Sequence, residues 1–357
     1  MAEQSSRQRF GRVYHKAAQP RKAAARAFGE SADWSDHDSP EALYTNRPIH
    51  LLQCLRPGQW VKNLLLLAAP FFAFFDRNQT VFADTVKGQA LCIAEGLGAA
   101  ILAFCLVSSA GYILNDIADR KQDAANPLKK TRPIAARQVS IPAAAVVLTL
   151  CLAGGLSLAW HLATHWATAW IKVSPFWLFP ALCGGYAALQ LVYTFGTRRF
   201  LNLGAMTVAV GFVLRAVAGA AFCDVRISPW LLLCVFLVAL FVALCKRRAA
   251  CFSKAAVQLS AADARILDIE IGLTASVTAA CYALYTLNPI TVGNFGTERL
   301  IYTVPFVLLG LFRHLYLTYG DHRGSGAVPE RVFTRDLGML AIVLAWVGAC
   351  LLVFTLV

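Results

Sequence analysis

The chain has 357 residues, of which 58% are hydrophobic and 15% are charged. Soluble proteins average about 45–50% apolar residues, so this composition excludes an ordinary soluble domain and predicts an all-α integral membrane protein. The formal net charge of +13 would indicate nucleic-acid binding in a soluble protein. Here the cations flank apolar runs, which favours contact with lipid head groups and argues against a nucleic-acid partner.

The first 50 residues differ from the rest of the chain. They carry scattered Arg and Lys among Ser, Asp and Ala, and no apolar core follows the first charges as it does in a secretory signal. We expect residues 1–50 to form a disordered, basic cytosolic tail and residues 51–357 to form one membrane domain. The cysteines form no CxxC pair, so we expect buried free thiols.

Apolar runs follow the tail along the whole chain. A helix needs about 20 apolar residues to cross a bilayer. Nine stretches approach or exceed this length, and they cover residues 59–75, 90–114, 139–161, 174–196, 202–222, 228–245, 266–287, 300–319 and 337–357. We expect nine transmembrane helices that bundle around a central cavity.

Lys and Arg residues predict the orientation of this bundle, because they accumulate on the cytosolic side of a membrane. Most of them lie in the tail and in the segments 115–138, 197–201, 246–265 and 313–336. The opposite segments carry Arg77, Lys87, Lys172, Arg226 and Arg299. We therefore expect the N-terminus inside, the C-terminus outside, and a cavity open to the cytosolic side of a bacterial-type inner membrane.

The segment between the second and third apolar runs reads LNDIADRKQDAANPLKKTRPIAAR, from Leu114 to Arg137. On a helix, Asp116, Asp119 and Asp123 would share one face, where three like charges repel one another. Either nearby cations or a divalent metal must compensate this repulsion. Carboxylate oxygens suit Mg²⁺, whose coordination is typically completed by water and substrate phosphates. Asn115 adds a neutral oxygen ligand or an orienting hydrogen bond.

Three cations follow these aspartates closely, at Lys129, Lys130 and Arg132. Such carboxylates and cations together can hold a complex of diphosphate with Mg²⁺, since the anions bind the metal and the cations bind the remaining phosphate oxygens. A solvated helix end with balanced charges explains the same spacing equally well.

The stretch NDIADRKQD resembles the NDxxDxxxD motif of the UbiA superfamily of intramembrane polyprenyltransferases. Members of that family have nine helices, and the motif follows the second helix. Longer stretches resemble one branch of that superfamily, the decaprenyl-phosphate phosphoribosyltransferases. They are LRPGQWVKNLLLLAAP (55–70), NPLKKTRPIAA (126–136), YTFGTRRFLNLGAMTVAVGFVLRAVAGA (193–220) and TVPFVLLGLFRHLYLTYGDHRGSGAVPERVFTRD (303–336). The resemblance extends across residues 51–357.

The resemblance implies transfer of a 5-phosphoribosyl group from phosphoribosyl diphosphate to a polyprenyl phosphate of the decaprenyl type. It also implies that Asp116, Asp119 and Asp123 are catalytic and bind Mg²⁺, which holds the leaving diphosphate. Two alternatives stay open. A prenyltransferase of the same fold would present a prenyl diphosphate to the same motif, and a non-catalytic protein would only bind or transport polyprenyl lipids. Polyprenol length does not follow from these motifs, and an oligomer is compatible with them.

Several further side chains are candidate substrate contacts. Lys62 and Asn63, in QWVKN, are expected at the cytosolic mouth of the first span, where Lys62 would contact a phosphate or snorkel beside Trp60. Arg215 lies deep within a span, where a charge is costly, so it would pair with a phosphate, an inward carboxylate or a neighbouring helix. The remaining candidates are Asn115, Lys130, Arg132, Tyr193, Arg198, Lys246 and Arg247.

Cytosolic topology alone would also explain Arg198 and the Lys246–Arg247 pair. The resemblance assigns phosphate contacts to them, with the pair holding the 5-phosphate of phosphoribosyl diphosphate. The same branch typically carries acids where this chain has Gly204 and Ala250, so the second half of the site lacks two expected carboxylates. Later acids that could take their place are Asp263, Asp268 and Glu270.

Overall fold

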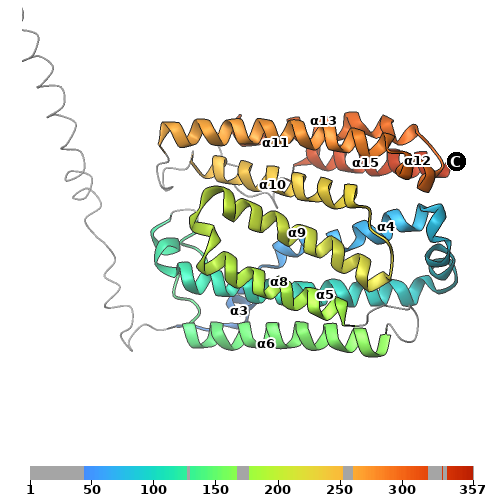
Figure 1. Ribbon diagram of the computed structural model, residues 1–357. Coiled ribbons are helices and arrows are strands. Elements are labelled where there is room, and N and C mark those ends of the chain that lie inside the picture. The colour runs from blue at the N-terminus through green and yellow to red at the C-terminus, as the bar shows by residue number, and fades with distance from the viewer. Residues whose placement is uncertain are drawn as a thin grey trace, which may run out of the picture. The chain divides into compact units, whose positions relative to one another are not determined.

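The computed structural model describes residues 44–126, 129–166, 177–251, 260–320, 332 and 336–356. Within these ranges the chain is helical and contains no strand (Figure 1), as its composition predicts. Most of the predicted tail lies outside the described residues. The predicted boundary at residue 51 falls inside the first described helix, α3, which begins at Pro48.

The helical elements follow one another through short connections wherever the chain is described. In order they are α3 (Pro48–Cys54), η2 (Pro57–Leu67), α4 (Ala68–Phe75), η3 (Arg77–Gln79), α5 (Thr80–Ala125), α6 (Ile141–His161), η4 (Leu162–Trp166), α8 (Leu178–Phe195), η5 (Thr197–Arg199), α9 (Leu201–Cys223), α10 (Pro229–Cys251), α11 (Ala261–Leu287), α12 (Pro289–Phe295), η6 (Arg299–Thr303), α13 (Val304–Tyr319) and α15 (Leu337–Thr355). The η elements are 3₁₀ helices, except that η4 is a π-helical turn.

Nine helical segments in the described part of the chain are long and apolar enough to cross a membrane, which confirms the predicted number of spans. The second span differs from its prediction in a way that matters for function. The apolar run ends at residue 114, but α5 continues as a helix to Ala125. The aspartates at 116, 119 and 123 therefore lie on the last turns of α5 and not on a loop.

This extension of α5 has a local cause. No Gly or Pro interrupts residues 115–125, so the helix can continue past the apolar run. It ends where Asn126 takes an extended conformation, with φ −95° and ψ 117°. Asn126 precedes Pro127 in the sequence, and a residue before proline avoids the helical region.

The first span is not a uniform α-helix. Its first part, η2, is a 3₁₀ helix of 11 residues, which is longer than such helices usually are. η2 packs directly on α9 at Gly219, where a Cβ atom would lie only 1.8 Å from the backbone oxygen of Leu66. Glycine is therefore required at position 219, and the close approach carries η2 into the interior of the bundle.

The spans pack mainly against their neighbours in sequence (Figure 1). α5 lies against α6 and α8, α9 lies against α8 and α10, and α10 lies against α11. The largest buried cluster joins the first span to α5, α8 and α9 through side chains such as Phe104 and Phe179. This packing brings three helix termini together: the end of α5, the start of α9 with its preceding turn η5, and the end of α10.

Candidate active site

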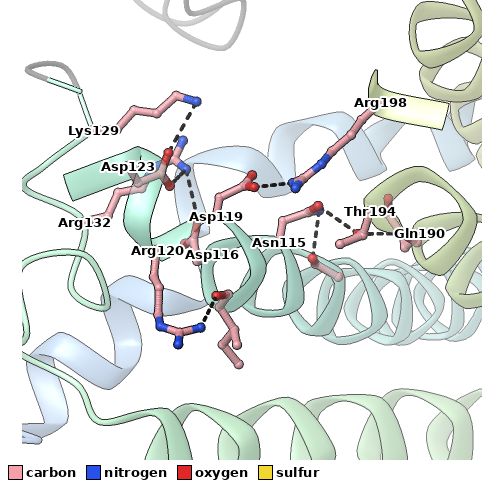
Figure 2. A network of polar contacts seen from close by, with 12 residues as sticks. Asn115, Asp116, Asp119, Arg120, Asp123, Lys129, Arg132, Gln190, Thr194 and Arg198 are labelled. Carbon is pink, nitrogen blue, oxygen red and sulfur yellow. Dashed lines mark hydrogen bonds and ion pairs between the residues drawn. The ribbon is translucent and has the colours of Figure 1, made fainter. Parts of the chain in front are cut away.

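Asp119 points from α5 toward the turn η5 (Figure 2). Its carboxylate lies 2.5 Å from Nη1 of Arg198, and the two side chains are 19% and 24% exposed. η5 follows Gly196, at which α8 ends, so the chain turns there and presents Arg198 to α5. The ion pair thereby connects η5, the turn that precedes α9, to the end of α5.

Asp116 and Asp123 share one cation. Nη1 of Arg132 lies 2.5 Å from Asp123 and 3.0 Å from Asp116, so a single guanidinium bridges both carboxylates (Figure 2). Arg56 also donates to Asp116, and Nζ of Lys129 lies 3.5 Å from Asp123. The two aspartates are only 4% and 2% exposed. Such burial requires these partners, because an unpaired buried charge is costly.

The aspartates offer the ligand chemistry that Mg²⁺ prefers, since all three contribute carboxylate oxygens from one helix face. Among the described residues, however, no group of three or more acidic, His or Cys side chains is arranged to hold a metal ion. Guanidinium groups occupy the carboxylates instead. The carboxylate donors are chemically compatible with Mg²⁺, and in this structure Arg132 lies between Asp116 and Asp123.

Asn115 precedes the aspartates and is held by neutral groups (Figure 2). The hydroxyl of Thr194 lies 2.8 Å from its Oδ1, and its Nδ2 donates to the carbonyl of Gly111 at 3.0 Å. The amide is thus oriented by α8 and by its own helix. A carbonyl oxygen has two lone pairs, so Oδ1 keeps one for a ligand.

α8 places a line of polar side chains beside α5. Tyr186, Gln190 and Thr194 are four positions apart and share one face of the helix. Nε2 of Gln190 donates to the Tyr186 hydroxyl at 2.7 Å, and Nη2 of Arg215 donates to the same hydroxyl at 2.6 Å. The line therefore runs from Asn115 at the end of α5 to Arg215 in the bundle interior.

Arg215 is a buried cation whose hydrogen bonds, within the described part of the chain, all go to neutral oxygens. Besides the Tyr186 contact, Nε donates to Asn63 at 2.7 Å and Nη1 donates to the carbonyl of Gly211 at 2.8 Å. The guanidinium also lies 4.4 Å from the centroid of the Tyr186 ring, a cation–π geometry. The sequence left a phosphate, an inward carboxylate or a neighbouring helix open as the partner of Arg215. The structure shows contacts to neighbouring helices, through Asn63 and Tyr186.

Asn63 is a buried interhelical contact. It is 1% exposed, and besides its bond to Arg215 it donates from Nδ2 to the Ser108 hydroxyl at 3.2 Å. Its predicted place at the cytosolic mouth of the first span stays a prediction. Lys62 is half-buried, and its Nζ donates to Oε1 of Gln59 at 2.5 Å.

The basic residues Lys246 and Arg247 lie at the end of α10. Lys246 is exposed, whereas Nη1 of Arg247 donates to the carbonyl of Phe200 at 3.3 Å. A Cβ atom at Gly204 would lie 2.2 Å from Nη2 of Arg247. An acid at position 204, which the family resemblance led us to expect, would therefore lie directly beside Arg247. The side chain of Ala250, where the second was expected, lies outside the described atoms.

The three later acids on α11 form contacts of their own. Asp268 accepts hydrogen bonds of 2.6 and 3.2 Å from Arg248. Oε1 of Glu270 accepts one of 2.6 Å from Asn202, and Asp263 lies in the first turn of the helix. In the described residues, no hydrogen bond or ion pair joins any of them to the aspartates of α5.

Two predicted substrate contacts stay available. The side chains of Lys130 and Tyr193 form no hydrogen bond or ion pair with the described residues, and Lys130 is exposed. Lys130 follows Asp123 by seven positions, and Tyr193 lies on α8 next to Thr194, which contacts Asn115. They are therefore open to a ligand, in contrast to the arginines that are already paired.

Sequence patterns did not single out Arg56, Thr194 and Tyr186. Arg56 reaches Asp116 from a left-handed backbone conformation, with φ 53°, and no sequence pattern indicates such a contact. For α8 a signal existed, because the polar residues at positions 186, 190 and 194 interrupt an apolar helix at helical spacing.

The described cysteines are free thiols, as predicted. One of them, Cys54, is buried near Asp116 and lies before the first span. Burial, assisted by the charge of Asp116, raises the pKa of Cys54 to about 11. The raised pKa favours the neutral thiol, which is a poor nucleophile.

Comparisons with known proteins point to one family. A family model described as the UbiA prenyltransferase family matches residues 88–333. A curated relative from Mycolicibacterium smegmatis, named decaprenyl-phosphate phosphoribosyltransferase, is 29% identical over 87% of this chain and 96% of the relative. A relative of the same name from Corynebacterium glutamicum is 30% identical over 83% of this chain and 84% of the relative.

Solved structures show the same architecture. Two are described as a UbiA homolog from Archaeoglobus fulgidus, bound to DMAPP and Mg²⁺ in one case and to GPP and Mg²⁺ in the other. Each matches with a TM-score of 0.58 and 16% sequence identity, covering 86% of this chain and 99% of the solved chain. The likeness confirms the all-helical architecture that the sequence predicts.

Proposed function

The chain belongs to the UbiA prenyltransferase family and is a transferase, and we propose that it moves a 5-phosphoribosyl group from phosphoribosyl diphosphate to a polyprenyl phosphate. Diphosphate is released, and the reaction depends on Mg²⁺. The proposal is carried by the cluster at the end of α5, where Asp116, Asp119 and Asp123 meet fixed cations. The names of the curated relatives support phosphoribosyl as the transferred group.

In this reaction a phosphate oxygen of the lipid attacks the anomeric carbon of the ribose. A carbon–oxygen bond forms, the bond from that carbon to the diphosphate oxygen breaks, and its electron pair leaves with the diphosphate. The attacking phosphate is already an anion, so no general base is needed. Negative charge grows on the diphosphate, and cations fixed around it stabilise the transition state. Bound Mg²⁺ would neutralise part of the same charge.

The residues at the end of α5 can exchange partners during binding. Asp116 and Asp123 would hold the metal, while Arg132 would turn from these carboxylates to the diphosphate oxygens. Asp119 and Arg198 would separate in the same way. The exchange keeps each charge paired before and after binding, which matters because Asp116 and Asp123 are almost inaccessible to solvent. Lys130 is free to add a further phosphate contact.

We place this end of the bundle on the cytosolic side of a bacterial inner membrane, with the N-terminus inside and the C-terminus outside. The support is the concentration of Lys and Arg at this end. A cavity open to the cytosol would admit phosphoribosyl diphosphate. Residues 51–357 would form the membrane domain and hold the polyprenyl chain among its helices.

Prenyl transfer is the second candidate function. The solved relatives bound to DMAPP and GPP favour it, and an aspartate cluster with Mg²⁺ accepts any diphosphate ester. A non-catalytic role in lipid binding or transport is disfavoured because the chain belongs to a transferase family.

Lipid nanodiscs containing the full chain distinguish these functions. With Mg²⁺, polyprenyl phosphate and phosphoribosyl diphosphate labelled in the ribose, we expect label to enter the organic extract and EDTA to prevent it. Asp119→Asn should abolish the transfer, whereas Asp84→Asn, a change at an exposed acid on the same helix, should not. Label that stays in water, with a prenyl diphosphate consumed by an aromatic acceptor, would establish prenyl transfer instead.

A further inference from the structure

An open pocket of ≈ 710 Å³ lies beside the start of α9. It is lined by the turn η5, by the first turn of α9, and by the face of α11 that carries Asp263 and Glu270. Arg198 and Arg199 are neighbours on η5, yet Arg198 is paired with Asp119 whereas Arg199 lines this pocket. The pocket and the aspartate cluster therefore share the turn η5 but involve different arginines.

One side of the pocket is suited to a phosphate. Within the described residues, Arg199 makes no hydrogen bond or ion pair, and its side chain is exposed. α9 begins after Phe200 without any side-chain cap, so the first N–H groups of a 23-residue helix lack a side-chain acceptor. A guanidinium next to the positive end of a helix favours an anionic group.

The opposite side of the pocket requires a hydrogen-bond donor. Oε1 of Glu270 accepts a bond of 2.6 Å from Asn202, but its Oε2 is buried and has no partner among the described residues. A buried carboxylate oxygen without a partner is costly. Asp263, exposed on the same helix, adds a second negative charge at the pocket wall. A cationic donor would pair with Glu270 and be attracted by Asp263, whose Oδ2 already accepts from the Ser260 hydroxyl at 2.7 Å.

The surroundings of the pocket are apolar and exposed. Leu203 on α9 is 48% exposed, and Ile266 and Ile269 on α11 are 51% and 69% exposed. On membrane-spanning helices, such side chains face lipid and not water. A ligand that combines a phosphate, a cationic donor and apolar chains would match every part of this surface.

We propose that this pocket binds a phospholipid with a primary-amine head group. The lipid phosphate contacts Arg199 and the start of α9, the ammonium donates to Glu270 and Asp263, and the acyl chains lie along α9 and α11. The proposal is independent of the reaction catalysed at the aspartate cluster. It excludes a simple phosphate monoester, because such an anion offers no cation to the two acids.

Lipids of matched acyl chains test this assignment by native mass spectrometry of the full, detergent-solubilised chain. We expect a phosphatidylethanolamine to bind about tenfold more tightly than phosphatidylcholine, whose quaternary ammonium has no N–H to donate. Phosphatidylglycerol, which has the phosphate but no cation, should also bind more weakly. This comparison uses the unmodified chain and needs no substitution.

Variants assign the two halves of the head group. Arg199→Gln should weaken binding of all three lipids, whereas Glu270→Gln should remove the preference for the primary amine and leave binding of phosphatidylglycerol unchanged or stronger. Arg265→Gln, an exposed change on α11 outside the pocket lining, is the matched control and should bind as the unmodified chain does. Equal binding of the three lipids, or preference for phosphatidylglycerol or a polyprenyl phosphate, would overturn the proposal.

Discussion

Arg132 and Asp123 form an ion pair of 2.5 Å at the end of α5, and the same guanidinium nitrogen lies 3.0 Å from Asp116. A cation thus stands between two carboxylates that suit a divalent metal. This arrangement stabilises the free protein, since it neutralises charges that are almost fully buried. If Asp116 and Asp123 bind Mg²⁺, Arg132 must leave them, and an incoming phosphate would offer it a new partner, so we expect metal and diphosphate to bind cooperatively.

The first prediction concerns this coupling. Mg²⁺ alone should bind weakly, and saturating diphosphate should tighten its binding by at least about tenfold, equivalent to about 1.4 kcal/mol of coupling. Isothermal titration calorimetry of the solubilised chain measures both affinities. In Arg132→Gln, Mg²⁺ alone should bind more tightly and diphosphate more weakly. Equal Mg²⁺ affinity with and without diphosphate would contradict the partner exchange.

The second prediction concerns the buried cation on α9. Tyr186→Phe removes the hydroxyl that accepts from Arg215 at 2.6 Å, which leaves part of a buried guanidinium without a partner. We expect a loss of about 1–3 kcal/mol of stability, seen as a lower thermal midpoint in detergent. Tyr302→Phe, at a tyrosine that is 71% exposed, is the control and should unfold normally.

Arg215→Lys provides a third test. A lysine cannot reproduce the planar guanidinium that reaches Asn63, Tyr186 and Gly211 in three directions. The variant should therefore be less stable than the unmodified chain. We expect a midpoint at least as low as that of Tyr186→Phe. Normal stability in the lysine variant would show that charge alone, without the fork geometry, is what this site requires.

The fourth prediction concerns pH. Asp336 lies just before the last span, caps α15 at the N–H of Met339, and accepts two hydrogen bonds from Arg313, which lower the pKa of Asp336. A carboxyl with a lowered folded pKa contributes stability above its unfolded pKa of about 4 and loses it as pH falls through the folded pKa. Asp336→Asn should therefore destabilise the chain at pH 7, and the loss should shrink as pH falls below about 4 through the folded pKa. A difference in thermal midpoint that stays constant across this range would contradict the ion pair.

The fifth prediction concerns orientation. Alkaline phosphatase fused after the last residue folds only outside the cytosol, so the fusion should be active if the C-terminus is exported. A fluorescent protein at the same position, which requires the cytosol, should stay dark. The opposite pattern would place the aspartate end of the bundle outside and would remove its access to phosphoribosyl diphosphate.

The sequence alone determined the spans and the helix face that carries the aspartates. Crossing a bilayer requires about 20 apolar residues, and helical spacing aligns Asp116, Asp119 and Asp123, so both follow from distances along the chain. It also carried the family resemblance, because the motif is a local string. The end of α5 was harder to place, since continuation past the apolar run depends on the absence of a breaker before Pro127.

Only the tertiary structure decided which charges meet. Arg215 finds Asn63 across 152 positions of sequence, and Arg56 finds Asp116 across 60. The cations that contact the aspartates also depend on packing, which brings η5 and Arg132 to the end of α5. Hydrophobic periodicity specifies each helix separately, whereas the pairing of side chains depends on how closely those helices pack, as at Gly219 against the backbone of Leu66.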